Sequence, residues 1–176
     1  MRIRTEFEAL CTAEQAWRAL HDPAVAAELY APLLVMRPEG GFPTELATGS
    51  EVRVRLMAFG AVPVGAQLIS ITDLEPSPPS AWPKTMRDHG EPAAGPLALL
   101  TEWRHEITIS RSLASANRAV WTDELHIGGA IAPLFRPVLA LMWRWRGRKL
   151  RRLAAEWGAT GPVAAARHAH PSPSAQ

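Results

Sequence analysis

Two polar residues, His105 and Asp123, have the types and the spacing to do acid–base chemistry together. Each lies in a run of alternating apolar residues, WRHEITIS and AVWTDELHIG, and a polar loop separates the two runs. A hairpin that sets His105 opposite Asp123 also places the large apolar residues of both runs on one face, as a half-buried sheet requires. The same register predicts two further pairs, Trp103 with Leu125 and Ile107 with Trp121.

A carboxylate beside an imidazole can orient the ring, so His105 and Asp123 are the candidate catalytic residues, acting as a general acid–base pair. The alternative is a structural hydrogen-bonded pair that neutralises itself in a partly buried wall. We favour this alternative, because polar pairs in pockets often only orient a bound molecule.

Other catalytic or metal sites find little support in the chain. It contains no Gly-x-Ser-x-Gly, no His-Glu-x-x-His and no glycine-rich phosphate loop. The six histidines lack the spacing of metal ligands, so we expect no metal and no cofactor. Cys11 is the only cysteine, which excludes an intramolecular disulfide and is typical of a small buried apolar residue.

Composition indicates one globular domain. The chain has 176 residues, of which 47% are hydrophobic and 20% charged. A net charge of only +2 gives little support to nucleic-acid binding. The N-terminus lacks the apolar core of a signal peptide, and the longest apolar run is too short to span a bilayer. We therefore expect a cytoplasmic protein, either a monomer or a homodimer.

The elements that must position the polar pair follow from hydrophobic periodicity and from capping signals. Thr12 and Gln15 form a capping-box pattern, and Asp22 precedes Pro23 as the start of a second short helix. The pattern predicts strands over 2–9, 33–36, 51–59, 64–74, 100–110 and 119–128, and helices from 13, over 24–29 and over 132–157. The proline-rich segment 75–96 is expected to be a mobile loop. We expect one domain over 1–157 and a disordered tail over 158–176.

The predicted C-terminal helix contains the basic stretch MWRWRGRKLRRLAAEW, residues 142–157. A helical wheel separates a basic arc from an apolar arc. The basic arc comprises Arg144, Arg148, Lys149, Arg151 and Arg152, and the apolar arc comprises Met142, Trp143, Leu150, Leu153, Ala154 and Trp157. Arg146 falls within the apolar arc and Trp145 within the basic arc. Both are amphipathic, so each is expected to lie across a boundary with its stem buried and its tip in water. The basic arc is interpreted as a solvated helix face, with an acidic lipid surface as the alternative.

This order of elements is typical of an α+β fold, with an antiparallel sheet packed against helices. A sheet that curls around one long helix can leave a cavity for an apolar ligand. Phe135, Leu139 and Met142 lie about one turn apart and are expected to line the floor of this cavity. The Arg-rich end of the helix is expected to project past the sheet into water.

Three segments resemble the SRPBCC superfamily, the START and birch-pollen-allergen-like helix-grip proteins. AEQAWRALHDPAVAAELYAPL is similar to the opening helices of the family, with Trp17, Leu20 and the Asp22-Pro23 break. WRHEITISRSLASANRAVWTDELHI is similar to its late hairpin, and APLFRPVLALMWRWRGRKLRRL to the closing helix of the polyketide-cyclase-like and coenzyme-Q-binding-like branches. The resemblance covers residues 1–157 and departs from the family at the long segment 75–96. It implies a helix-grip fold, a curved antiparallel sheet wrapped around a long C-terminal helix, with two short helices after the first strand.

Three hypotheses about function follow. The first is a non-catalytic protein that binds a small hydrophobic molecule of lipid, polyketide or aromatic type. Its expected ligand-binding residues are Trp103, His105, Ile107, Trp121, Asp123, Leu125, Phe135, Leu139 and Met142. The second is a cyclase or dehydratase that uses His105 and Asp123, as the resemblance to that branch implies. The third is a regulatory or membrane-touching module that uses the Arg-rich helix end. We favour binding over catalysis because the expected cavity has few polar groups.

Overall fold

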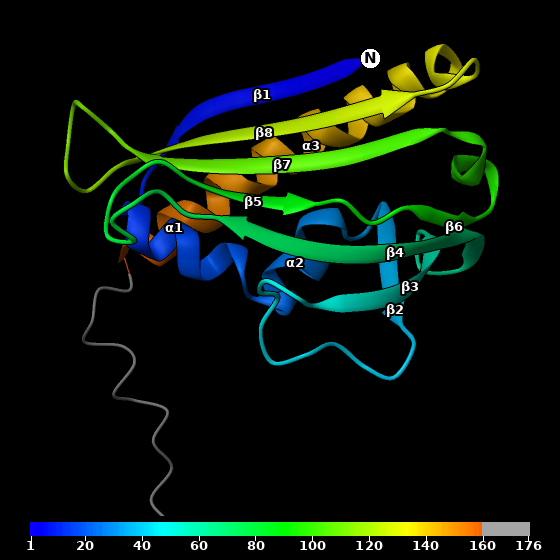
Figure 1. Cartoon of the computed structure of the whole chain (residues 1–176), viewed down its shortest axis with the longest axis horizontal. Helices are drawn as coiled ribbons and strands as arrows, with labels where there is room; N and C mark the ends of the chain where they lie inside the picture. The colour runs from blue at the N-terminus through cyan, green and yellow to red at the C-terminus, as the bar shows by residue number, and fades with distance from the viewer. Residues whose placement is uncertain (160–176) are drawn as a thin grey trace, which may run out of the picture.

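The computed structural model describes residues 1–159, which form an antiparallel sheet packed against three helices (Figure 1). The strands are β1 (Arg2–Ala9), β2 (Leu34–Pro38), β3 (Glu51–Ala58), β4 (Val62–Leu74), β5 (Lys84–Asp88), β6 (Pro92–Ala94), β7 (Glu102–Arg111) and β8 (Ala119–Gly128). The helices are α1 (Ala13–Leu20), α2 (Pro23–Tyr30), the short 3-10 helix η1 (Pro96–Leu99) and α3 (Ala132–Ala159). The α+β prediction is confirmed. The predicted disordered tail lies, apart from Gly158 and Ala159 at the end of α3, outside the described residues.

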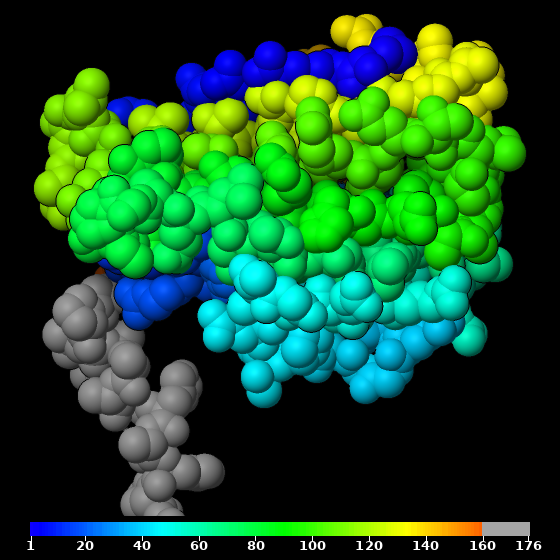
Figure 2. All heavy atoms as spheres, in the orientation of Figure 1, coloured from blue at the N-terminus to red at the C-terminus, as the bar shows by residue number. Residues whose placement is uncertain are grey.

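The main sheet has the strand order β1-β8-β7-β5-β4-β3-β2, and β6 adds to β4. All its strand pairs are antiparallel. The two helices α1 and α2 carry the chain from β1 at one edge to β2 at the other. The long helix α3 crosses behind the sheet, on the face opposite to the viewer of Figure 1. Figure 2 shows the other face of the sheet as a continuous surface.

Local signals in the sequence explain where the short helices begin. The Thr12 hydroxyl accepts a hydrogen bond from the Gln15 backbone N–H, and the Gln15 side chain accepts one from the Thr12 N–H. These two bonds satisfy backbone donors that the first turn of a helix leaves free. Asp22 caps α2 by accepting from the Ala24 N–H at 2.8 Å. The predicted starts of both helices are confirmed.

The prediction of a mobile loop over residues 75–96 is wrong in its second half. Lys84–Asp88 form β5, which pairs with β4 on one side and with β7 on the other. Pro92–Ala94 form β6, which pairs with β4. A strand this short gives little periodicity to detect, and its flanking prolines dominate the sequence signal. Segment 84–94 therefore belongs to the sheet.

The predicted register of the β7–β8 hairpin is wrong by two residues. His105 is paired with Leu125 and Ile107 with Asp123, not His105 with Asp123. Because side chains alternate between the two faces with a period of two, this shift leaves every residue on the expected face. His105 and Asp123 therefore lie diagonally across neighbouring strands, still within reach of each other.

Two apolar clusters fill the space between the sheet and the helices. The first joins β1, α1, α2 and the sheet with the C-terminal half of α3, where Leu150, Leu153 and Ala154 are buried. The second joins β8 and the loop before β7 with the N-terminal half of α3, where Leu139 and Trp143 are buried. The prediction that the Arg-rich end projects past the sheet is wrong, because its inner side packs on β1 and α1. Among the described residues, no helix combines the length and apolar character needed to cross a membrane.

An ion pair between the buried His21 and the partly buried Asp73 connects the corner between α1 and α2 to β4. The Nε2 atom of His21 lies 3.2 Å from a carboxylate oxygen of Asp73, and its Nδ1 atom lies 2.8 Å from the Trp17 carbonyl oxygen. Both contacts place an acceptor against a ring nitrogen, and only the charged imidazolium has two N–H donors. Burial opposes the charge, but these bonds outweigh it and raise the pKa of His21 above its ordinary value. Burial likewise opposes ionisation of Asp73, yet the His21 contact lowers the pKa of its carboxyl group.

This pair predicts a specific dependence of stability on pH. The raised pKa of His21 stabilises the folded state fully below its unfolded pKa of about 6.5, and this contribution is lost as the pH rises through the folded pKa. The lowered pKa of Asp73 acts oppositely, and its contribution is lost only in acid. We expect His21→Asn to lower the melting temperature more at about pH 5.5 than at about pH 8.5. Thermal melts of both proteins at both pH values test this; an equal loss at each pH would contradict it.

Candidate functional site

A cavity of about 90 Å³ lies between the inner face of the sheet and helices α2 and α3. About 10–15 Å³ on the same scale suffices for one water molecule, so the space exceeds that of a single water. Most of its wall is apolar. The apolar lining comprises Ala19, Leu20, Val25, Ala26, Leu29, Leu34, Met36, Leu46, Leu56, Ile69, Ile71, Met86, Leu97, Trp103, Ile107, Trp121, Met142 and Trp143. The remaining lining residues are Tyr30, Gln67, Asp88, His105 and Arg146.

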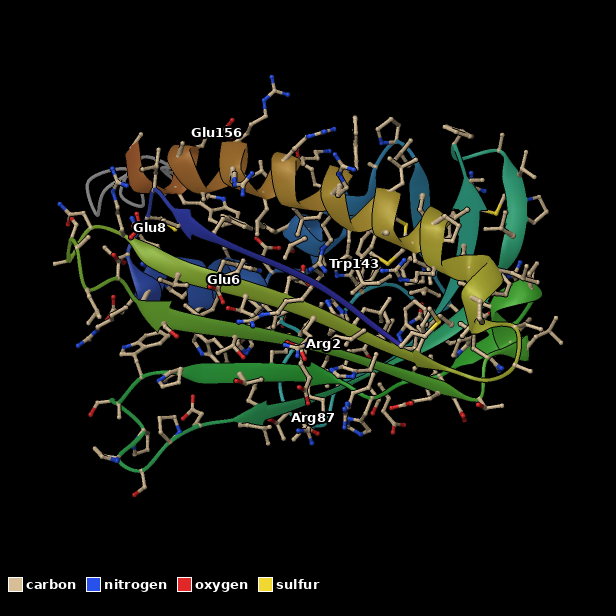
Figure 3. The ribbon with its side chains drawn as sticks, turned by 90° about the horizontal axis from the view of Figure 1, so that it is seen from above. Arg2, Glu6, Glu8, Arg87, Trp143 and Glu156 are labelled. Carbon is tan, nitrogen blue, oxygen red and sulfur yellow. The ribbon has the colours of Figure 1, made fainter. Side chains whose placement is uncertain are left out.

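The cavity exists because the inner faces of several elements converge on it. Strands β4, β5 and β7 each contribute residues two positions apart, as expected for one face of a pleated sheet. Helix α3 contributes Met142, Trp143 and Arg146. Arg146 lies four positions after Met142 and three after Trp143, so the three residues share one side of the helix. In Figure 3, Trp143 lies between α3 and the sheet, whereas Glu156 projects from the opposite side of the helix. Helix α2 closes a further side of the cavity.

A buried polar network crosses from α3 to β7 and β8. The Arg146 guanidinium lies 2.7 Å from Oδ2 of Asp123 and 2.9 Å from Nε2 of His105. The other carboxylate oxygen, Oδ1, lies 2.7 Å from the same His105 nitrogen and accepts a hydrogen bond from the Trp143 indole N–H at 2.9 Å. All four side chains are nearly inaccessible to solvent. The Nε2 atom of His105 thus faces both the Asp123 carboxylate and the Arg146 guanidinium.

Charge pairing determines the ionisation of this network. Burial opposes ionisation of Asp123, but the positive charge of Arg146 and the contact with His105 outweigh it, so the pKa of the Asp123 carboxyl group lies below its ordinary value. Burial also opposes the charge on Arg146, and Asp123 compensates, so the pKa of the guanidinium is raised. A carboxylate and a guanidinium thus form a charged pair inside the protein. Such a pair is tolerated only because each partner offsets the desolvation of the other.

Two more ionisable groups in the cavity wall are shifted toward their neutral forms. Asp88 is the cross-strand partner of His105, and its Oδ1 accepts from the Ser70 and Gly90 backbone N–H groups. Burial raises its pKa despite these bonds. Burial also raises the pKa of Tyr30, whose ring lies 5.1 Å from the Arg146 guanidinium. The polar part of the wall therefore offers hydrogen-bonding groups with little uncompensated charge.

The structure brings part of the predicted site together. Trp103, His105, Ile107, Trp121 and Met142 line the cavity. The structure also places His105 in contact with Asp123. Asp123 itself does not line the cavity, but its partner His105 does. The roles assigned to these residues remain predictions.

Three of the predicted lining residues lie elsewhere. Leu125, Phe135 and Leu139 belong to the second apolar cluster, beside Trp143 and away from the cavity lining. The physical reason is the length of α3. The turns of α3 that carry Phe135 and Leu139 belong to one apolar cluster with Leu125 and Ile127 of β8. Residues one turn further along the helix line the cavity instead.

Sequence patterns missed the central residue of the network, Arg146. It was expected to keep its charged tip in water, but its side chain is only 4% exposed. The one available signal is its position inside the apolar arc of the helix, four residues after Met142. A charged residue there must either reach water or find a buried partner. Asp88 was not expected near the site, because segment 84–94 was taken for a loop.

Metal and thiol chemistry have no visible basis in the part of the chain that the structure describes. No group of three or more His, Cys, Asp or Glu side chains is placed to hold a metal ion within residues 1–159. Burial raises the pKa of the Cys11 thiol to about 11, so the thiolate form is scarce near neutrality.

Comparison with known proteins supports the fold. No known sequence family and no curated protein matches the chain. Several solved structures do match in three dimensions. A protein from Chromobacterium violaceum has a TM-score of 0.59 at 17% identity, over 88% of this chain and 97% of that one. Norcoclaurine synthase from Thalictrum flavum, in complex with a transition-state analogue, has a TM-score of 0.53 at 15% identity, over 89% and 94%. A START superfamily protein from Mycobacterium smegmatis has a TM-score of 0.51 at 9% identity, over 88% and 97%.

These similarities identify the fold of the chain. The chain shares the helix-grip fold of these START-like structures over most of its length, as the sequence resemblance implied. At such low identities the likeness extends to the architecture and not to substrates or catalytic residues.

Proposed function

We propose that the protein binds a small hydrophobic molecule, of lipid, polyketide or aromatic type, in the cavity between the sheet and α3. The observation that carries this proposal is an apolar cavity with one polar network in its wall. Ligand sites are commonly built this way, since apolar area supplies affinity and a few polar groups fix the orientation.

Unpaired hydrogen-bond donors support a ligand that also carries oxygen atoms. Among the described residues, the indole N–H groups of Trp103 and Trp121 and the Nε–H of Arg146 are buried without a partner. All three residues contribute to the cavity wall. A buried donor without an acceptor costs free energy, so a carbonyl or hydroxyl oxygen within reach would be stabilising.

The ion pair of Arg146 and Asp123 favours binding over the cyclase or dehydratase alternative. In a catalytic pair, the carboxylate supports the positive charge that develops on the imidazole. Here the Asp123 carboxylate already pairs with a guanidinium at 2.7 Å, so less of its charge is available to His105. That norcoclaurine synthase shares the fold does not change this argument, because one fold hosts many functions.

A cavity-filling variant tests the binding proposal. Ile69 on β4 lines the cavity, and Ile69→Trp should occupy much of its space. We expect the wild-type protein to enhance the fluorescence of anilinonaphthalene sulfonate, and the variant to bind this dye at least about tenfold more weakly, as expected when a pocket is filled. The fully exposed Leu113 provides the control, since Leu113→Trp adds the same indole outside the cavity. Equal dye binding by wild type and Ile69→Trp, with both proteins folded in thermal melts, would refute the proposal.

A further inference from the structure

Helix α3 carries an exposed stripe that the cavity does not use. We define the outer stripe of α3 as six residues on its solvent side, Leu134, Val138, Leu141, Trp145, Arg148 and Arg152. Successive members are three or four positions apart, so they follow one line along the helix. Glu156 lies four positions after Arg152 and so continues this line. In Figure 3, Glu156 projects from the side of α3 opposite to the sheet.

The first part of the outer stripe is apolar and exposed. Leu134, Val138 and Leu141 are 75%, 66% and 63% exposed, so each displays most of its surface to solvent. Pro133 and Pro137 are also exposed beside them. Single exposed apolar residues are common, but a contiguous apolar patch on a folded protein marks an interaction site.

The second part of the outer stripe is basic. Arg148 and Arg152 are exposed, as is Arg144 beside them, and none of the three makes an ion pair within the described residues. Trp145 stands between the apolar and the basic parts and is 36% exposed. Glu156 follows at the end of the helix and is the one acidic residue on this side of its last turns.

We propose that the outer stripe of α3 docks on the surface of a membrane that contains anionic lipid. In this arrangement Leu134, Val138 and Leu141 enter the boundary between headgroups and acyl chains. Arg148 and Arg152 lie against lipid phosphates, as in amphipathic helices that bind in the plane of a membrane. Trp145 then occupies the interfacial level that tryptophan prefers.

Two features favour a lipid surface over a second copy of this chain. Pairing two outer stripes in parallel would oppose Arg148 to Arg148, and pairing them antiparallel would set arginine against leucine. The stripe also runs along the outside of a single helix, so its exposed side chains form a convex ridge. Such a ridge needs a soft or grooved partner, and lipid provides one without a matching groove.

Vesicle flotation of the full chain tests this proposal. We expect binding to phosphatidylcholine vesicles that contain about 30% phosphatidylserine, and at least about tenfold weaker binding to phosphatidylcholine alone. The triple variant Leu134→Ser, Val138→Ser and Leu141→Ser should weaken binding at least about tenfold, as should the double variant Arg148→Gln and Arg152→Gln.

Matched controls show whether vesicle binding depends on the outer stripe or on any exposed leucine or arginine. Leu113→Ser removes a fully exposed leucine from the β7–β8 loop, and Arg53→Gln removes an exposed arginine from β3; both should bind like wild type. Vesicles with brominated acyl chains should quench the fluorescence of wild type more than that of Trp145→Phe. The proposal would be overturned if binding did not depend on anionic lipid. It would also be overturned if the control variants lost as much vesicle affinity as the stripe variants. A wild-type dimer in light scattering that the leucine variant converts to monomer would likewise overturn it.

Discussion

Asp123→Ala should destabilise the protein by about 3–5 kcal/mol, the cost of leaving one partner of a buried ion pair alone. Asp123 and Arg146 are each only 4% exposed, so the guanidinium cannot reach water once the carboxylate is gone. The substitution also removes the acceptor of the Trp143 indole N–H and the partner of His105. Urea unfolding at neutral pH measures this loss, with the midpoint and slope fitted separately.

A double-mutant cycle shows whether the ion pair is the cause. Arg146→Met should also destabilise the folded protein, since it leaves the buried Asp123 carboxylate without its charged partner. The variant with both changes should lose much less than the sum of the single variants, because neither charge is then left unpaired. Asp123→Asn retains an acceptor for Trp143 and should fall between wild type and Asp123→Ala. A loss below about 1 kcal/mol for Asp123→Ala would mean that Arg146 finds water or another partner.

Met142→Arg is expected to have the second large effect, a loss of several kcal/mol in stability together with loss of dye binding. Met142 lines the cavity and lies one helical turn before Arg146 on the same side of α3. A second guanidinium there would meet apolar side chains and a like charge, and Asp123 is already paired. Thermal melts and dye titration of the same preparation measure both effects.

Arg148→Ala on the outer stripe provides the comparison for this prediction. Arg148 is exposed and makes no ion pair among the described residues, so its removal should shift stability by no more than about 0.5 kcal/mol. If Arg148→Ala damages the fold more than Met142→Arg, the assignment of the two sides of α3 is wrong.

The sequence alone determined most of the local structure. Capping residues such as Thr12 and Asp22 marked helix starts because they satisfy backbone donors within three residues of chain. Alternating apolar residues assigned 100–110 and 119–128 to strands and identified their inner faces, since that alternation is a property of the strand itself. The periodicity of residues 142–157 separated the buried side of α3 from its basic side in the same way.

Tertiary structure decided what depends on contacts distant in the chain. Short strand β5 is held by hydrogen bonds to β4 and β7, and local composition cannot reveal a strand stabilised by its neighbours. Hairpin register depends on how both strands pack in the fold, so the alternation of residues predicted the face of His105 and Asp123 but not their cross-strand partners. Arg146 is buried only because the fold brings a carboxylate from β8 to within 2.7 Å of it. A helical wheel cannot predict that contact, because the desolvation of a charge is offset by a partner that lies in another element.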